Sequence, residues 1–317
     1  MTKIIHDRRG GMPDKKRRRA LLALLGAVLI WGTTYVSTKQ AISQVPPVTL
    51  AFIRNVLACL VLLPFFLRDP GRRRRVPWGS LALLGFSGSF LYLSLQNWGL
   101  YYTSASAGSL IQGSIPIIIA VFSIIFLGER VNIYRTLGII LAIAGVAGLV
   151  FLGGEVQGGS RPVLGNLLML VSSLAWGAYT VLNKRFNLNI SPVMATLATF
   201  FFGLLFLLPF TIMEMRGFNY ALSWLTVANV LYLGVAAMAL PIFLWNYALL
   251  YYDASEAGLF INLVPVFSVI CAVLFLGEQV NAGQLAAGAV VILGVLVSSG
   301  FDIRHKAQES RAGGQSP

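Results

Sequence analysis

ASAGSLIQGSIPIIIAVFSIIFLGERVN, residues 105–132, returns later in the chain as ASEAGLFINLVPVFSVICAVLFLGEQVN, residues 254–281. The two segments align without a gap at a constant offset of 149 residues. A second pair, WGTTYVSTK at 31–39 and WGAYTVLNK at 176–184, aligns at an offset of 145. Self-similarity of this kind indicates that the chain contains two copies of one structural unit.

The composition is typical of an integral membrane protein. Of the 317 residues, 57% are hydrophobic and 11% are charged, and the mean hydropathy is +0.77. Apolar stretches of about 20 residues are long enough to cross a bilayer as helices, and they are too continuous for barrel strands. We expect ten spans, at residues 20–42, 47–67, 78–101, 104–127, 133–152, 164–184, 192–213, 222–250, 254–277 and 282–300.

The ten spans and the internal repeat predict an all-α membrane protein made of two inverted five-helix repeats. The first repeat covers residues 20–152 and the second covers 164–300, with a connecting loop at 153–163. Residues 1–19 and 301–317 are polar tails. Because five is odd, the two repeats enter the bilayer from opposite sides. Inverted repeats are a recurring construction of secondary transporters, in which the site lies between the two halves.

The basic residues are distributed unevenly between the two sides. If the N-terminus is cytoplasmic, 20 of the 24 Lys and Arg residues lie on the cytoplasmic side, and only Arg161 and Arg216 lie opposite. This bias predicts a multi-pass membrane protein with both termini in the cytoplasm. The net charge of +13 therefore reflects helix flanks facing anionic lipid headgroups, and we expect no nucleic-acid partner.

Several of these features resemble one known family. They are the Trp-Gly pairs at 31–32 and 176–177, Arg54, and the Ala-Ser…Pro…Leu-Gly-Glu pattern in both copies of the long repeat. Over residues 20–300 the chain resembles the EamA family of the drug/metabolite transporter superfamily. The best-known members of this family are bacterial inner-membrane exporters of amino acids and related metabolites, including aromatic amino acids, so the resemblance implies a location in the plasma membrane, the inner membrane of a bacterium. The resemblance implies a central cavity lined by the first, third, fourth, sixth, eighth and ninth spans, with the fifth and tenth behind them.

Polar and aromatic residues on those spans are the candidates for substrate binding. In 20–42 and in 164–184 they recur at helical spacing and form one stripe, which would waste hydrogen bonds if it faced lipid. The alternative is structural, since Ser and Thr bond to their own backbone and amides join helices. The expected cavity residues are Trp31, Tyr35, Thr38, Tyr92, Gln96, Asn97, Gln112, Trp176, Tyr179, Asn183, Trp245, Asn246 and Asn262.

Charged residues at the ends of spans are candidates for a gate. Lys39 and Lys184 correspond at the offset of 145 and should lie at opposite mouths of the cavity, where each could pair with a carboxylate or with helix carbonyls. The simpler interpretation is a cation that complements a helix dipole. Glu256 begins a span, where a negative charge is favoured for the same reason. Arg54 has no charged counterpart, and we expect it to serve a structural pairing.

Other motifs predict structure rather than chemistry. Gly128 and Gly277 should end helices in the left-handed conformation, with Asn132 and Asn281 capping the next helices, and the neighbouring Glu129 and Glu278 should serve only this loop geometry. Pro116 and Pro265 should kink their helices, as should Pro241. Cys59 and Cys271 are isolated, so we expect no disulfide, metal site or cofactor. Small residues in 133–152 and 282–300 permit close packing within the chain or in a homodimer.

The function expected from the sequence is export of small metabolites, most of all amino acids or related compounds, by alternating access. A nucleophile, metal cluster or paired carboxylates at depth would indicate an enzyme, and none is found, so we expect no enzymatic activity. The alternatives are a carrier of drug-like or nucleotide-sugar cargo and a channel-like facilitator. A nucleotide-sugar site would need more cations than Lys39 and Lys184.

Overall fold

The computed structural model describes residues 14–69, 77–128, 133–151, 160–186, 190–216, 222–249, 251 and 260–312. Every regular element within these residues is a helix. The helices are α1 (Asp14–Ala41), α2 (Pro47–Leu67), α3 (Trp78–Gly85), η4 (Phe86–Leu91), α4 (Tyr92–Tyr102), α5 (Ala105–Gln112), α6 (Ile115–Leu127), α7 (Ile133–Phe151), α8 (Pro162–Phe186), α9 (Pro192–Met215), α10 (Trp224–Leu231), η5 (Tyr232–Ala236), α11 (Ala237–Leu249), α13 (Leu263–Leu276) and α14 (Ala282–Ala312).

Six helical segments are long and apolar enough to cross a membrane, namely 18–41, 47–67, 78–102, 105–127, 162–186 and 193–215. Four shorter apolar helices cover 136–149, 224–236, 263–276 and 282–297. The prediction of an all-α membrane protein is therefore confirmed. Two ends differ from expectation, because α1 begins within the basic run at Asp14 and α14 continues to Ala312.

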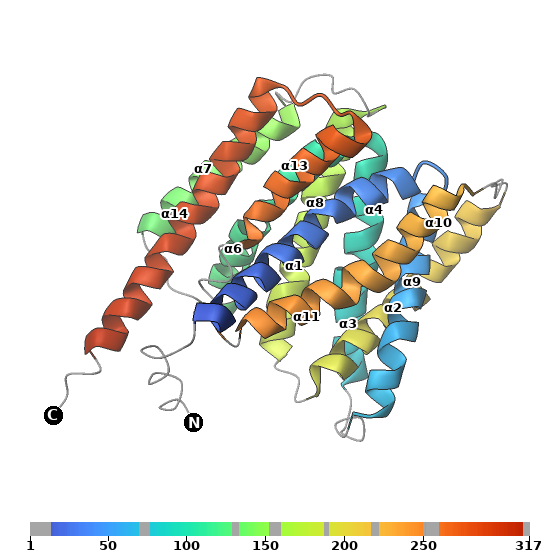
Figure 1. The fold of residues 1–317 in the computed structure, drawn as a ribbon, viewed down its shortest axis with the longest axis horizontal. Helices are drawn as coiled ribbons and strands as arrows, with labels where there is room; N and C mark the ends of the chain where they lie inside the picture. The colour runs from blue at the N-terminus through green and yellow to red at the C-terminus, as the bar shows by residue number, and fades with distance from the viewer. Residues whose placement is uncertain are drawn as a thin grey trace.

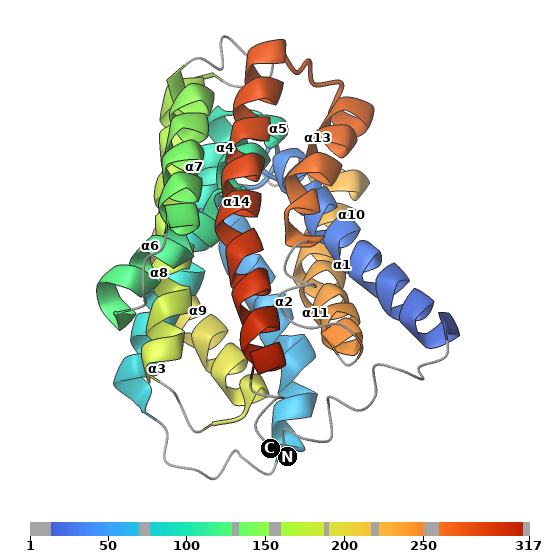
Figure 2. The ribbon, with the colours of Figure 1, turned by 90° about the vertical axis from the view of Figure 1, so that its left-hand side faces the viewer.

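The helices form one bundle, with α7 and α14 side by side at one edge and α2 and α9 at the other (Figures 1 and 2). Small residues allow the close contact between α7 and α14. A Cβ atom placed on Gly145 would lie 2.8 Å from the carbonyl oxygen of Ala287, and one on Gly294 would lie 2.7 Å from the backbone nitrogen of Ala142. The small residues of these two helices thus serve packing within the chain.

Helices α2 and α9 run antiparallel and are joined at both ends by an acidic side chain. Where α2 begins, the Glu214 carboxylate at the end of α9 accepts hydrogen bonds from the backbone nitrogens of Val48 and Thr49, at 3.1 and 2.8 Å. Where α9 begins, its N-cap residue Ser191 donates a hydrogen bond to the Asp69 carboxylate. A negative charge at a helix N-terminus is stabilising, so both contacts hold the pair together.

The glycine of each Trp-Gly pair lies where two helices approach most closely. A Cβ on Gly32 in α1 would lie 2.8 Å from the Cβ of Phe267 in α13. A Cβ on Gly177 in α8 would lie 2.5 Å from the side chain of Ile118 in α6. Only glycine permits this spacing, which gives the paired motif a packing role in addition to any role of its tryptophans.

The segment 105–127 is broken rather than kinked. Helix α5 ends at Gln112, residues 113–114 form a turn, and α6 begins at Ile115, so Pro116 lies in the first turn of α6. The predicted kink at Pro116 is wrong, because proline is tolerated at a helix start, where no backbone donor is lost. Pro265 likewise lies in the first turn of α13, whereas Pro241 lies inside α11.

The predicted helix ends at Gly128 and Gly277 are confirmed. Both glycines adopt the left-handed conformation, with φ of 66° and 65°. Asn281 caps α14 by accepting a hydrogen bond from the Gln284 nitrogen at 2.8 Å, and its own nitrogen donates to the Gln284 side chain at 3.2 Å. Asn132 and Glu129 lie outside the described residues.

Two π-helical segments interrupt the third and eighth apolar stretches, η4 at 86–91 and η5 at 232–236. Such segments widen a helix by one residue in a turn and redirect the side chains that follow. In this chain, η4 comes directly before Tyr92 and Gln96 of α4. The sequence pattern gave no sign of either segment.

Candidate functional site

A hydrogen-bond network centred on Gln112 lies in the middle of the bundle. The side-chain oxygen of Gln112 accepts hydrogen bonds from the Tyr35 hydroxyl at 2.6 Å and from the Gln96 amide at 2.9 Å. Its amide nitrogen donates to the Ser172 hydroxyl at 3.1 Å. Gln96 also donates to the Tyr92 hydroxyl at 3.2 Å. The network therefore connects α1, α4, α5 and α8 through uncharged groups.

The network is buried, but aromatic rings at its border are partly exposed. Tyr35, Gln96 and Gln112 are 8, 8 and 4% exposed. Two half-buried tryptophans lie on the same helices as members of the network, Trp176 on α8 and Trp31 on α1. The Trp176 ring lies 4.7 Å from that of Tyr92 (centroid to centroid) and 5.1 Å from that of Tyr179. The Trp31 ring lies 5.6 Å from that of Trp245, so α1 and α11 meet through aromatic side chains.

Local structure explains how Gln112 reaches the centre. It is the last residue of α5 before the turn at 113–114, so its side chain lies at mid-depth of a broken helix. Gln96 and Tyr92 share one face of α4 at a spacing of four residues. Tyr35 and Trp31 share a face of α1 in the same way. The stripe predicted on 20–42 thus faces protein rather than lipid.

The structure does not bring all predicted site residues to this network. Asn97 is buried, and its amide donates to the Pro47 carbonyl at 2.8 Å, which ties α4 to the start of α2. Thr38 is buried one turn beyond Tyr35. Asn183 and Lys184 are exposed at the end of α8. Asn262 is a buried residue at the N-cap of α13, where it makes no capping hydrogen bond.

Two further predicted residues cannot be placed. Glu256 lies outside the described residues, and of Asn246 only its backbone position in α11 is described. Within the described part of the chain, no three His, Cys, Asp or Glu side chains come together as a metal site would require. Cys59 and Cys271 are free thiols.

Lys39 and Glu278 clamp the turn between α4 and α5 from opposite sides. The Lys39 ammonium donates to the carbonyls of Leu100 and Thr103, both at 2.5 Å, at the end of α4. The Glu278 carboxylate accepts from the backbone nitrogens of Ala105 and Ser106 at 2.7 and 3.0 Å, at the start of α5. Each charge therefore complements the helix dipole that it meets.

The clamp corrects the prediction for Glu278. Its position after Gly277 suggested loop geometry alone, yet the side chain is 7% exposed and makes a third bond, from the Ser106 hydroxyl at 2.7 Å. These contacts are 172 and 173 residues away in sequence. Lys39 pairs with helix carbonyls, one of the partners expected for it.

Arg54 in α2 is a buried charge of a different kind. Its side chain is 7% exposed, and its Nε and Nη1 atoms have no hydrogen-bond partner among the residues that the structure describes. The Tyr92 hydroxyl is within electrostatic range of the guanidinium. The expected structural pairing of Arg54 is therefore not seen at these two nitrogens.

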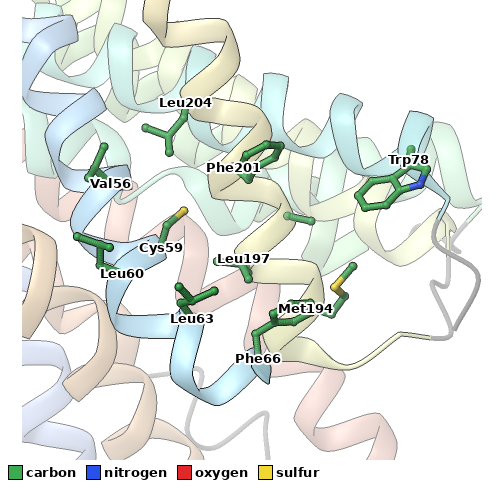
Figure 3. Close-up of a pocket in the computed structure, with 11 residues that line it drawn as sticks. Val56, Cys59, Leu60, Leu63, Phe66, Trp78, Met194, Leu197, Phe201 and Leu204 are labelled. Atoms are coloured by element: carbon green, nitrogen blue, oxygen red, sulfur yellow. The ribbon is translucent and has the colours of Figure 1, made fainter. Parts of the chain in front are cut away.

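A groove with a volume of about 350 Å³ lies apart from the network, between α2, α3 and α9 (Figure 3). All of its lining side chains are apolar, among them Cys59, Trp78 and Phe201. Leu60 and Trp78 are 60 and 57% exposed on the surface of the bundle. The lining holds no charged, amide or hydroxyl side chain, so the groove belongs with the apolar surface that membrane-spanning helices present to lipid.

Comparison with known proteins identifies the architecture. The sequence model of the EamA-like transporter family matches residues 18–151 and, a second time, residues 163–300. The chain belongs to the EamA-like transporter family. It is therefore a multi-pass membrane transporter of the drug/metabolite type and not an enzyme, as the sequence predicted.

Relatives of this EamA-like transporter carry similar names. An uncharacterized transporter of Archaeoglobus fulgidus is 30% identical over 88% of this chain and 96% of that protein. A probable terminal-alkyne amino-acid exporter of Streptantibioticus cattleyicolor is 26% identical over 94% of this chain and 99% of its own length. A probable amino-acid metabolite efflux pump of Salmonella typhimurium is 26% identical over 93% and 99%.

The fold of the EamA-like transporter also resembles that of a solved crystal structure. The TM-score is 0.60 at 22% sequence identity, and the superposition covers 90% of this chain and 98% of the other. This likeness concerns the arrangement of helices.

One member of the network was missed by the sequence analysis. Ser172 in α8 donates to the Tyr92 carbonyl at 3.1 Å while accepting from Gln112. It lies one turn before Trp176 on the stripe already identified, so extending that stripe by four residues would have found it.

Proposed function

We propose that this transporter exports amino acids or related small metabolites through a site at the Gln112 network. The network carries the proposal because it joins residues of both matched segments. Tyr35, Gln96 and Gln112 belong to the first segment, and Ser172 and Trp176 belong to the second. A substrate bound between the segments is coupled to any movement of one against the other.

The chemistry of the network suits a small polar molecule with an apolar part. Amides and hydroxyls supply donors and acceptors without a net charge, and the adjoining tryptophan and tyrosine rings supply flat apolar surface. Transport requires such a site to form and release bonds repeatedly, which favours neutral hydrogen bonds over strong ion pairs. The names of two relatives, an amino-acid exporter and an amino-acid metabolite efflux pump, support the same substrate class.

We further infer an arrangement of two inverted five-helix repeats. The support is that acidic residues at matching positions each accept hydrogen bonds from the N-terminal residues of the partner helix. Glu214 and Asp69 correspond at the offset of 145, and each contacts the first residues of the other helix of the α2–α9 pair. Pro64 and Pro209, inside α2 and α9, correspond at the same offset. The double match to the family is a second support.

Alternating access gives the end contacts a role. The Lys39–Glu278 clamp ties α1 and the segment between α13 and α14 to the α4–α5 turn, and in the proposed mechanism it acts as a gate at that end of the bundle. With cytoplasmic termini, as the distribution of basic residues favours, this end is the outer one. Opening it requires these charged hydrogen bonds to exchange for water.

Flux measurements on a Gln112→Leu variant test the proposal. The exchange keeps the volume but removes every hydrogen bond of the central side chain. We expect uptake of labelled amino acids into inside-out vesicles to fall by about tenfold or more, because two or three hydrogen bonds contribute about 1 kcal/mol each. Metabolite profiling of the medium of overexpressing cells would identify which compounds to label.

Gln40→Leu is the matched control. Gln40 lies five residues after Tyr35 in α1, but its side chain accepts from Asn229 of α10 at 3.0 Å and is not part of the network, so the same chemical change there should leave flux near that of the wild type. Equal flux in the Gln112→Leu and wild-type proteins, at equal abundance, would rule out the network as the substrate site. Flux that does not saturate with concentration would instead indicate a channel-like facilitator.

A further inference from the structure

Arg54 is a charge in the membrane interior without sufficient partners. A guanidinium stays protonated at any physiological pH, so burial cannot neutralise it. In a membrane-spanning helix such a charge pairs with carbonyls, a carboxylate or water, because leaving it bare is costly. Nε and Nη1 of Arg54 are buried and make no hydrogen bond to the described residues. Each of these two nitrogens leaves an N–H donor free, and a hydrogen bond from a guanidinium to a carboxylate is one of the strong, charge-assisted kind.

The location of Arg54 connects it to the proposed site. The Tyr92 hydroxyl lies within electrostatic range of the guanidinium and also accepts the hydrogen bond from Gln96. Arg54 thus stands at one end of a chain of groups that runs through Tyr92 and Gln96 to Gln112. The guanidinium is thus a positive charge beside the Tyr92 end of the network.

The corresponding position in the second half has no such feature. Thr199 occupies it at the offset of 145, and its hydroxyl donates to the Ala195 carbonyl of its own helix at 2.9 Å. The Thr199 hydroxyl has a hydrogen-bond partner within its own helix, whereas Nε and Nη1 of Arg54 have none among the described residues. The charge therefore has no counterpart in the second half, and a substrate recognised by it binds in one orientation.

We propose that Arg54 binds the carboxylate of the transported molecule, so that the transporter selects zwitterionic and anionic substrates over cationic ones. This inference rests on the proposed function, which it narrows to carboxylate-bearing compounds. The carboxylate accepts a hydrogen bond from a free N–H donor of the guanidinium, while amine and side chain face the neutral network and its aromatic rings. Because Arg54 is 7% exposed, the carboxylate reaches it in a state in which α2 and α4 have moved apart.

The test compares the wild type with Arg54→Met and Arg54→Lys. The probes are L-phenylalanine, L-leucine, benzoate and succinate, each beside its uncharged-carboxyl amide. Two quantities are measured, the thermal unfolding midpoint of the purified protein with each probe and the flux of each probe in proteoliposomes. We expect carboxylates to raise the wild-type midpoint more than amides do, and Arg54→Met to lose about tenfold or more in carboxylate-over-amide preference. Arg54→Lys should keep part of the preference for carboxylates over amides.

A purely structural Arg54 gives different results. Removing a buried charge that lacks partners should leave the ligand-free midpoint of Arg54→Met unchanged or raised. A midpoint several degrees lower, together with an unchanged preference for carboxylates, would overturn the inference. Arg68→Met, which removes an exposed charge at the end of the same helix, is the control and should match the wild type in both measurements.

The measurements distinguish failure of the proposed function from failure of the inference about Arg54. If the wild type moves no amino acid, the proposed function fails, but the role of Arg54 is still decided by the midpoints with benzoate and succinate. A carboxylate that stabilises the wild type and not Arg54→Met supports the inference. If no carboxylate stabilises the wild type, the inference is wrong.

Discussion

Glu278 and Arg54 are both 7% exposed, yet their surroundings differ completely. The two carboxylate oxygens of Glu278 accept three hydrogen bonds from Ala105 and Ser106. Two of the guanidinium nitrogens of Arg54 have no partner among the described residues. A buried charge whose bonds are complete stabilises the structure around it. One whose bonds are incomplete costs free energy, and such a cost persists in a protein when the group acts on a ligand.

Glu278 and Arg54 should respond in opposite ways when their side chains are truncated. Truncating Glu278 leaves backbone donors of α5 buried and unpaired, whereas truncating Arg54 removes an existing deficit. The region around Glu278 should thus respond in stability, and the region around Arg54 in substrate selection. Three further substitutions test whether effects on stability and effects on substrate selection separate in this way.

The largest effect on stability is expected for Glu278→Ala. It removes the cap from the start of α5 and leaves the ammonium of Lys39 without its nearby negative charge. We expect the free energy of unfolding to fall by about 3–5 kcal/mol, the cost of breaking a buried charge interaction from one side. The measurement is the thermal unfolding midpoint in detergent and abundance in the membrane. Glu278→Gln keeps one carbonyl acceptor and should lose less. If both variants were as stable as the wild type, the contrast with Arg54 would disappear.

An intermediate effect is expected for Lys39→Met. The variant keeps the apolar stem but loses two short bonds to the carbonyls of Leu100 and Thr103. The loss should be about 1–2 kcal/mol, the range for a cation at a partly buried helix end. If the clamp is a gate, flux falls while membrane abundance stays near normal. If flux is unchanged and the unfolding midpoint is lower, Lys39 has only a structural role, as Glu278 does.

The smallest effect is expected for Glu214→Ala. Its carboxylate also caps a helix, α2, but it is only half-buried, so water can replace it. A loss of about 1 kcal/mol is typical of an exposed helix cap. Unfolding midpoints of Glu214→Ala and Glu278→Ala, measured side by side, separate the contribution of burial from that of capping. A loss equal to that of Glu278→Ala would show that burial contributes nothing.

Most of the fold could be predicted from the sequence because a bilayer sets the length of each apolar stretch. The spans at 47–67 and 192–213 agree with α2 and α9 to within two residues. The paired glycines at 128 and 277 also adopt the predicted conformation, because only a glycine meets that requirement at low cost. These are local or one-dimensional properties, which a sequence states directly.

The candidate site could be predicted only in part. The stripe on α1 correctly indicated that Tyr35 faces protein, but helical spacing cannot say how far a stripe extends. The stripe predicted on α8 therefore included Asn183, which is exposed, and left out Ser172, which is buried. Glu278 was misjudged because its partners are more than 170 residues away. That Nε and Nη1 of Arg54 have no partner among the described residues is a property of the assembled bundle, so no sequence pattern could reveal it.

The paired caps of α2 and α9 bear on how the bundle can move. With Glu214 holding one end and Asp69 the other, any motion that keeps both contacts leaves these two helices fixed against each other. Under the proposed alternating access, the other helices of each half would move relative to this pair, and those farthest from it would move most. Arg54 is the eighth residue of α2, so the carboxylate that we propose it binds would lie beside this pair and would be displaced least.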